Sequence, residues 1–393
     1  MLKKLMNTFK KNVAGFIFVV LCVWLVWMAI IHLQKKPVEA VSSRVILEQT
    51  WVGFQQNFIH QGRVVRPIEK DSVSEGQAYT MLRAVYMNDK KIFDECYAWS
   101  EHHLSRLMQF NDHLLAWHWK DGRVSDWMPA SDADLDYAYS LILADEKWHH
   151  QYPDHVTPYG LKAKLILQDI LKKETFRTSS NRLYLHPWIA SEEQENLRQQ
   201  NLSYYAPAYF RKFYQKTNDV RWLELLDTYY AMIDEINYRG IEEGMPGIYP
   251  DWMLVDQHDQ LSYNPKKSNR FGWEAIRIPI RMAMDHHPDT HKRFKSPFTE
   301  YLSRTWQDQT KLYAEYQPDP FKFDGVYEHP LFYAGYALML REYDSSSADE
   351  IIHKTRMSLK KIDKAGWVYL NEDDYYVNAL MWLVEYVFAA QSL

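Results

Sequence analysis

The sequence predicts an all-α fold: an (α/α)6 barrel of six outer and six inner helices, preceded by one transmembrane helix. Six segments combine Ala or Gly and aromatic residues early with aliphatic residues later, which is typical of closely packed inner helices; they begin near residues 75, 132, 204, 274, 331 and 375. A more charged, amphipathic stretch precedes each of them, near residues 45–58, 91–108, 158–172, 219–238, 291–313 and 347–362. Alternation with a period of two is sparse, and the long connectors, at 182–186 or 247–256, are the places where short strands could occur.

The first element is an uncharged, apolar run at residues 13–31, about long enough for a helix that crosses the hydrocarbon core with roughly 20 residues. Lysines precede the run, which favours a cytoplasmic amino terminus. Lys35 and Lys36 follow the run and reduce the difference in positive charge between its two sides. A cleaved signal peptide has a similar pattern, but this run contains Trp24 and Trp27 and lacks a small-x-small cleavage site. We therefore expect residues 1–36 to form a cytoplasmic tip and an uncleaved signal anchor in the cell membrane, with the remaining chain outside the cell.

Beyond the anchor, the chain has no low-complexity tract and no long Gly, Ser or Pro linker, so residues 37–393 are predicted to form one domain. A net charge of −5 gives no basic face for nucleic acid. The 16 histidines show no recognisable ligand spacing and no Gly-rich phosphate loop occurs, so we expect neither a metal site nor a cofactor. Aromatic residues make up 15% of the chain, and sugar rings stack on such flat faces.

Two short acidic motifs stand where inner helices are expected to begin. Residues 74–79 read Ser-Glu-Gly-Gln-Ala-Tyr, and residues 130–136 read Ala-Ser-Asp-Ala-Asp-Leu-Asp. An acidic side chain in the first turn is stabilised by the helix dipole and points out of the helix end. Capping alone would explain one such motif. Two of them indicate that both helix ends open onto a single cleft that contains Glu75 and Asp132.

This pair of motifs resembles glycoside hydrolase family 8, a family of inverting glycanases with an (α/α)6 barrel. The family pattern Ala-Ser/Thr-Asp-Ala/Gly-Asp is matched at residues 130–134, and the small and aliphatic residues that follow it are matched through Trp148. Tyr137 departs from the usual Ile or Met. Weaker similarities occur in family order at residues 202–208, 250–252 and 271–277, so that the resemblance spans roughly residues 50 to 390.

The resemblance implies a role for several residues. Glu75 matches the general acid, and burial among aromatic rings would keep it protonated near neutral pH. Asp132 matches the aspartate that positions the distorted sugar, whereas Asp134 and Asp136 are interpreted as structural. Tyr204 resembles the tyrosine that contacts the nucleophilic water or the base. Family members carry a similar Trp-x-Trp ahead of the aspartate motif, so we expect one or two of the following residues to form aromatic subsites: Trp117, Trp119 and Trp127.

The general base has two candidates. The largest subgroup of the family uses an Asp in an Asp-Ala-x-Arg motif, and this chain has Glu274 at that position, with Arg277 one helical turn later. Glu is a competent base, and Arg277, which we also count among the substrate-binding residues, could hold the carboxylate ionised. The extra methylene nevertheless moves the carboxylate by about a bond length, and catalysis is sensitive to roughly 1 Å. Another subgroup takes its base from a different loop, so Glu242 and Glu243 are the alternative.

The sequence thus predicts an endoglucanase-like hydrolase that cleaves β-glycosidic bonds of a polysaccharide outside the membrane with inversion. The expected substrate is a β-1,4-glucan or an exopolysaccharide that the cell itself makes. The expected partners are this polysaccharide, the lipid membrane, and an exopolysaccharide synthesis or export machinery. The altered base position supports one alternative, a catalytically impaired, membrane-tethered polysaccharide-binding protein.

Overall fold

The computed structural model describes residues 41–148, 151–152, 157–189, 197–242, 247–317, 327–362 and 365–390. The chain divides into two compact units, Met1–Ile46 and Leu47–Leu393. The predicted anchor run at 13–31 lies outside the described residues, so the transmembrane helix stays a prediction. Within the described ranges, no helix combines the length and the apolar character needed to cross a membrane.

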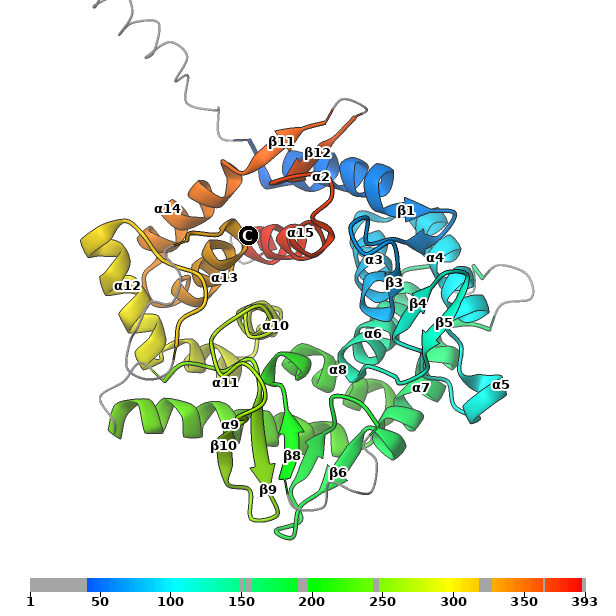
Figure 1. Cartoon of the computed structure of the whole chain (residues 1–393), viewed down its shortest axis with the longest axis horizontal. Coiled ribbons are helices and arrows are strands. Elements are labelled where there is room, and N and C mark those ends of the chain that lie inside the picture. The colour runs from blue at the N-terminus through cyan, green and yellow to red at the C-terminus, as the bar shows by residue number, and fades with distance from the viewer. Residues whose placement is uncertain are drawn as a thin grey trace, which may run out of the picture. The chain divides into compact units, whose positions relative to one another are not determined.

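Helices dominate the described part of the chain, and they form two sets. The outer set contains α2 (Ser43–Phe58), α4 (Lys90–His103), α7 (Tyr159–Lys173), α9 (Arg221–Glu242), α12 (Pro297–Gln309) and α14 (Ser345–Arg356). The inner set contains α3 (Ser74–Met87), α6 (Ser131–Trp148), α8 (Pro207–Thr217), α10 (Arg277–Ala283), α13 (Pro330–Leu340) and α15 (Tyr375–Ala390). Figure 1 shows the inner helices as a ring with the outer helices around it. This arrangement is consistent with the predicted (α/α)6 barrel.

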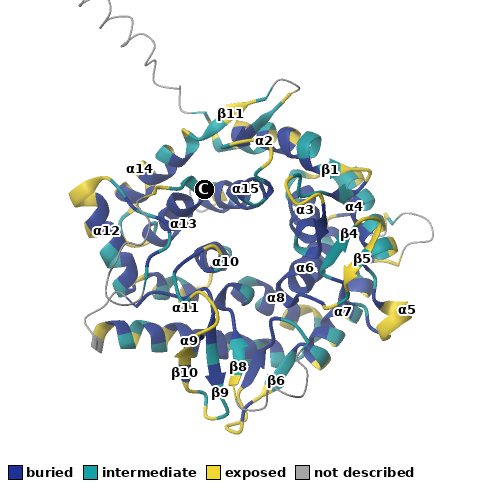
Figure 2. Ribbon diagram, viewed as in Figure 1, coloured by how far each residue is buried: buried dark blue, intermediate teal, exposed yellow. Residues whose placement is uncertain are grey.

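Burial separates the two sets as their sequences suggested. In α4 the buried side chains are Phe93, Cys96, Tyr97 and Ser100, a spacing that places them on one helix face. In α13 every residue from Leu331 to Leu340 is buried, which a helix surrounded by neighbours on all sides requires. Figure 2 shows the same contrast, with mostly buried inner helices and outer helices that expose one side.

Several predicted helix boundaries are wrong by a few residues or more. The outer stretch expected at 291–313 is divided into α11 (Pro288–His291), the 3-10 turn η2 (Lys292–Phe294) and α12. Ser296 caps α12 by accepting a hydrogen bond from the backbone N of Thr299, and Pro297 at the first helical position suits a fresh start. The outer stretch expected at 91–108 ends at His103, and a separate short helix, α5 (Leu107–Phe110), follows. The inner helices expected from Tyr204 and Glu274 begin three residues later.

The connectors contain short antiparallel strands in five small sheets. The three-stranded sheets are β3 (Ser72–Val73), β4 (His118–Lys120) and β5 (Arg123–Asp126), and β8 (Leu197–Gln200), β9 (Met253–Asp256) and β10 (Leu261–Tyr263). The two-stranded sheets pair β1 (Ile59–His60) with β2 (Arg63–Val64), β6 (Thr175–Arg177) with β7 (Leu183–Leu185), and β11 (Leu359–Lys361) with β12 (Trp367–Tyr369). Of these strands, β7 and β9 lie in the connectors where strands were expected; the others are two to four residues long and show too little alternation to be recognised.

One of these sheets positions the first acidic motif. Strand β3 pairs with β4 and runs directly into α3, and the backbone N of Ser74 donates to the carbonyl oxygen of Trp117 at 2.9 Å. Val73 is still extended, with φ −120° and ψ 150°. The sharp change from strand to helix places Glu75 in the first turn of α3, with its side chain at the helix end.

Candidate active site

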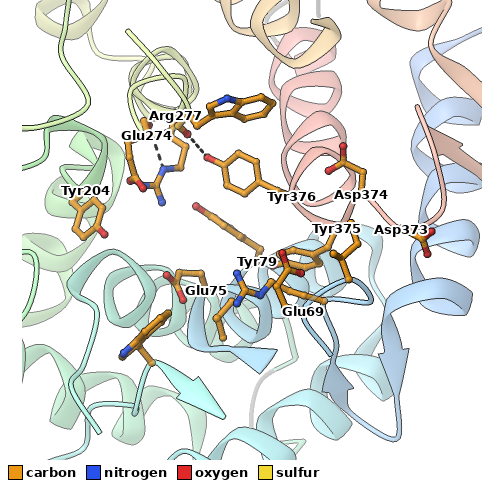
Figure 3. Close-up of a pocket in the computed structure, with 15 residues that line it drawn as sticks. Glu69, Glu75, Tyr79, Tyr204, Glu274, Arg277, Asp373, Asp374, Tyr375 and Tyr376 are labelled. Carbon is orange, nitrogen blue, oxygen red and sulfur yellow. Dashed lines mark hydrogen bonds and ion pairs between the residues drawn. The ribbon is translucent and has the colours of Figure 1, made fainter. Parts of the chain in front are cut away.

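A cleft of about 410 Å³ collects residues from the starts of α3 and α15, from the segment before α10 and from the connectors. Its described lining consists of Arg66, Ile68, Glu69, Val73, Glu75, Tyr79, Trp117, Tyr204, Trp273, Glu274, Arg277, Asp373, Asp374, Tyr375 and Tyr376. Figure 3 shows the carboxyl groups of Glu75 and Glu274 on two sides of this cleft, one from α3 and the other from the chain just before α10. Two acidic residues some 200 positions apart in the sequence therefore share one cavity.

Glu75 is partly buried, and the hydroxyl of Ser74 donates to its Oε2 over 3.3 Å. Burial raises the pKa of Glu75 to about 8, and the negative charge of Asp132 acts in the same direction. The positive charge of Arg277 opposes this rise without cancelling it. The Glu75 carboxyl is therefore protonated at neutral pH, which suits a proton donor.

The residues that follow Glu75 explain the rest of its motif. A Cβ at position 76 would lie 2.9 Å from the hydroxyl oxygen of Tyr375, so Gly76 leaves space for a residue that lines the cleft. The side chain of Gln77 accepts from the backbone N of Val64 at 2.6 Å and donates to the carbonyl oxygen of Gly62 at 2.9 Å. Gln77 thus fastens the β1–β2 hairpin to the helix that carries Glu75.

Asp132 lies beside the cleft but is not among the described residues that line it. Its side chain is 1% exposed, and its Oδ2 accepts from Nη1 of Arg277 at 2.7 Å. Oδ1 accepts from the backbone N of Ala133 at 2.9 Å. Burial raises the pKa of Asp132, and the charge of Arg277 opposes this rise. The start of α6 was expected to open onto the cleft. In the structure Asp132 bonds Arg277, and Arg277 is the residue that lines the cleft.

Asp134 bonds the connector before β4, and Asp136 links α6 to α8 and α10. Oδ1 of Asp134 accepts from the backbone N of Leu115 at 2.9 Å. Asp136 accepts from both terminal nitrogens of Arg281, at 2.5 and 2.6 Å, and from the hydroxyl of Tyr209 at 2.8 Å. Both carboxylates are fully buried. The structural role expected for them agrees with these contacts.

Glu274 lies on the cleft surface with a side chain that is 36% exposed. Its Oε2 accepts from Nη2 of Arg277 and from Nδ2 of Asn201, the latter at 3.0 Å. Burial would lower the pKa of Arg277, but neighbouring acids, Glu274 first among them, hold this pKa well above its ordinary value. Among the described residues, none donates a hydrogen bond to Oε1 of Glu274, so that oxygen can accept one from a water in the cleft.

Asn201 is a site residue that the sequence interpretation missed. It is 1% exposed, and its Oδ1 accepts from both the backbone N and the hydroxyl of Ser203, at 3.0 and 2.7 Å. These two bonds fix the orientation of the amide, so that Nδ2 faces Glu274. Its position directly before the family-like segment at 202–208 was the available signal. Tyr204, from that segment, lines the cleft with its ring centroid 5.2 Å from Cζ of Arg277, and its contact with the nucleophilic water or the base stays a prediction.

Only one of the three predicted tryptophans lines the cleft. Trp117 does, whereas the guanidinium of Arg63 lies 4.1 Å from the ring centroid of Trp119, and Trp127 lies against Phe110 with 5.8 Å between ring centroids. Neither Trp119 nor Trp127 belongs to the described lining, so Trp117 is the tryptophan of these three that lies in the cleft, where one or two were expected. Strand β4 begins at His118, so Trp117 lies outside it and does not have to share a face with Trp119. The aromatic lining that the sequence interpretation missed comprises Tyr79, Trp273, Tyr375 and Tyr376.

Glu242 and Glu243 are the alternative candidates for the base. Glu242 is the last residue of α9, but its side chain and the whole of Glu243 lie outside the described residues. Over the described ranges, no group of three or more His, Cys, Asp or Glu side chains could hold a metal ion.

Sequence comparisons match the chain to one family and to several endoglucanases. Residues 29–316 match the family model described as "Glycosyl hydrolases family 8". An endoglucanase of Salmonella typhi is 26% identical over 253 residues, covering 62% of this chain and 63% of that protein. An endoglucanase of Escherichia coli strain K12 is 28% identical over 268 residues, covering 64% and 68%. The matched part thus spans slightly less than two thirds of the Salmonella protein.

Solved structures agree in fold. The endo-β-1,4-glucanase CMCax from Acetobacter xylinum superposes with a TM-score of 0.68 at 24% identity, covering 90% of this chain and 100% of that one. The endo-1,4-D-glucanase from Vibrio fischeri ES114 superposes with a TM-score of 0.73 at 24% identity, covering 88% and 95%.

Proposed function

The chain belongs to glycosyl hydrolase family 8, and from this premise we propose that it hydrolyses β-glycosidic bonds of a polysaccharide with inversion at the anomeric carbon. The observation that carries the proposal is the pair of unlike carboxyl groups in one cleft. Glu75 is held protonated by its surroundings, whereas Glu274 is ion-paired with Arg277. Two acids with opposed environments are what hydrolysis by a general acid and a general base requires.

Glu75 supplies the proton. As the bond from the anomeric carbon to the leaving oxygen lengthens, the carboxyl of Glu75 donates its proton to that oxygen, so that the leaving sugar departs as a neutral alcohol. The cleft accommodates this step because Glu75 is both protonated and part of its lining.

Glu274 receives the second proton. A water on the opposite face of the sugar attacks the anomeric carbon while Oε1 of Glu274 accepts its proton, and the product has inverted configuration. An inverting pair needs its carboxyl groups about 6.5 to 9.5 Å apart to make room for that water. Asn201 and Arg277 hold Oε2 and leave the other oxygen for the water.

Asp132 and Arg277 position the reacting sugar. Arg277 lines the cleft and bonds both Asp132 and Glu274, so its guanidinium is held between two carboxylates. We keep Asp132 as the residue that orients the sugar at the cleavage point, through Arg277 or after a small shift towards the substrate. Trp117 and Tyr204 offer ring faces for sugar stacking in the same cleft.

The substrate class that we propose is a β-1,4-glucan or an exopolysaccharide that the cell itself exports. The endoglucanases of Salmonella typhi and Escherichia coli support the glucan. The anchor that the sequence predicts at residues 1–36 is the reason for proposing a self-made polymer, because a scavenging enzyme gains more by diffusing away from the cell. In this proposal the catalytic domain lies outside the membrane, near the machinery that makes or exports the polymer.

The test is the release of reducing ends from a panel of cell-made and plant glycans, with NMR detection of the anomer formed first. A β-linked substrate should give the α-anomer before mutarotation. A β-anomer as the first product would contradict inversion. Protein that binds glycans but releases no reducing ends from any of them would favour the alternative, a catalytically impaired polysaccharide-binding protein.

A further inference from the structure

We propose that Asp251 is a positioning residue: it fixes the backbone of Glu274 and thereby the carboxylate that receives the proton of the water. The inference rests on the proposed function, in which Glu274 is the general base. Asp251 lies in the connector between α9 and β9, is 5% exposed, and is not among the described residues that line the cleft. It therefore has to act through another residue.

The Asp251 carboxylate collects the backbone donors around Glu274. Its Oδ1 accepts from the backbone N of Gly272, Glu274 and Ala275, at 3.1, 3.0 and 2.8 Å. Its Oδ2 accepts from the hydroxyl of Ser268 at 2.7 Å. A buried carboxylate is costly unless it is bonded in this way, and bonds from N–H groups to a charged acceptor are among the stronger ones. Three backbone N–H groups of the turn that carries Glu274 thus donate to a single oxygen atom, Oδ1 of Asp251.

Gly272 makes this arrangement possible. A Cβ at position 272 would lie 2.3 Å from Oδ2 and 3.0 Å from Cγ of Asp251, well inside contact distance. Any larger residue would push the carboxylate away from the backbone N–H groups that it holds. The glycine is therefore required by the close approach of Asp251.

The same turn is held at two further points. The hydroxyl of Tyr376 donates to the carbonyl oxygen of Trp273 at 2.6 Å. Asn201 and Arg277 hold the end of the Glu274 side chain at Oε2. Asp251 fixes where the side chain starts and the other residues fix where it ends, which matters because a displacement of about 1 Å in a catalytic group can cost about 100-fold in rate.

Two substitutions of Asp251 separate geometry from charge. In Asp251→Asn the amide oxygen can still accept the three backbone hydrogen bonds and the NH2 group can donate to Ser268, so we expect kcat to stay within about threefold of the wild-type value. In Asp251→Ala the turn loses its anchor, so we expect kcat to fall by about 10- to 100-fold with little change in KM. Asp256→Ala is the matched control, since Asp256 also bonds two backbone N–H groups, of His258 and Gln260, but in the β9–β10 turn.

A double-mutant comparison distinguishes positioning from general damage. In a Glu274→Ala background, with azide as the replacement nucleophile, there is no base left to misplace. Asp251→Ala should then leave the residual or azide-rescued turnover within about twofold, whereas damage to the whole cleft would lower it by the same factor as in the wild type. Equal losses in the two backgrounds, or a full-rate Asp251→Ala protein, would overturn the inference.

Gly272→Ala covers the case in which Asp251→Ala does not fold. It keeps the carboxylate but displaces it, and it should lower kcat in the wild type without lowering the rescued turnover of Glu274→Ala. The outcome is separable from the proposed function: a wild-type protein that releases no reducing ends contradicts the function, whereas an active wild type with an insensitive position 251 contradicts only the role of Asp251.

Discussion

Arg277 and Asp132 form a buried ion pair, with 2.7 Å between Nη1 and Oδ2 and side chains that are 7% and 1% exposed. The other terminal nitrogen of the same guanidinium bonds Oε2 of Glu274. One cation therefore ties the first turn of α6 to the residue that we propose as the base. Because both its partners are carboxylates, the remaining negative charge near the cleft helps to keep the proton on Glu75.

The first prediction concerns the acid. Glu75→Gln keeps the shape of the side chain but cannot donate the proton, so kcat should fall by about 100-fold or more while oligosaccharide affinity is retained. Reducing-end assays and calorimetric binding measure the two effects. Glu95→Gln, in the neighbouring helix α4, is the control that should retain full activity. A Glu75→Gln protein with a near wild-type rate would refute the assignment of the acid.

The second prediction is the pH dependence of activity. Burial raises the pKa of Glu75 from an ordinary value of 4.5 to about 8, so the protonated, active form is lost as the pH rises through about 8. A kcat profile on a glucan substrate should therefore decline on that alkaline side. A rate that stays constant up to pH 10 would contradict a proton-donating Glu75.

The third prediction follows from the same shift and concerns stability. The pKa of Glu75 is higher in the folded than in the unfolded protein. The free energy of unfolding therefore falls as the pH rises from about 4.5 to about 8, because the ionised carboxylate is less favourable in the folded state. Glu75→Gln removes this loss. Its Tm relative to the wild type should therefore be higher at pH 8.5 than at pH 4, as measured by thermal unfolding. An equal difference in Tm at the two pH values would argue against the raised pKa.

The fourth prediction identifies the base. Glu274→Ala should abolish hydrolysis and leave oligosaccharide affinity nearly unchanged, because the base contacts the water more than the sugar. Azide should partly restore turnover and give a glycosyl azide of inverted configuration, since a small anion can enter from the side of the water. NMR of the product checks this. Loss of activity in Glu242→Ala or Glu243→Ala, with Glu274→Ala active, would move the base to the other loop.

The fifth prediction concerns the length of the base. Glu274→Asp restores the acid that the family usually carries, but it withdraws the carboxylate by about a bond length from Asn201 and Arg277. With the backbone fixed by Asp251, kcat should fall by about 10- to 100-fold. Steady-state kinetics on one glucan substrate measure it. A faster Glu274→Asp enzyme would mean that the remaining site residues are placed for aspartate.

The sequence by itself determined the helical alternation and the two acidic motifs. Outer helices such as α4 need one apolar face and inner helices such as α13 need apolar residues all round, and both patterns are local. Glu75 and the Glu274–Arg277 pair could also be singled out from the sequence, because each lies inside a short motif. The helix expected at residues 13–31 lies outside the described residues and stays a prediction.

Only the tertiary structure decided which of these residues meet. Arg277 and Asp132 are 145 positions apart, Asn201 and Glu274 are 73 apart, and Asp251 bonds the turn of Glu274 from 23 positions away. No local periodicity encodes such pairs, since they depend on how the connectors fold over the barrel. The surroundings of Trp119 and Trp127 also depend on tertiary pairing: Trp119 lies opposite Ser72 of β3, 47 positions earlier, and Trp127 packs on Phe110, 17 positions earlier.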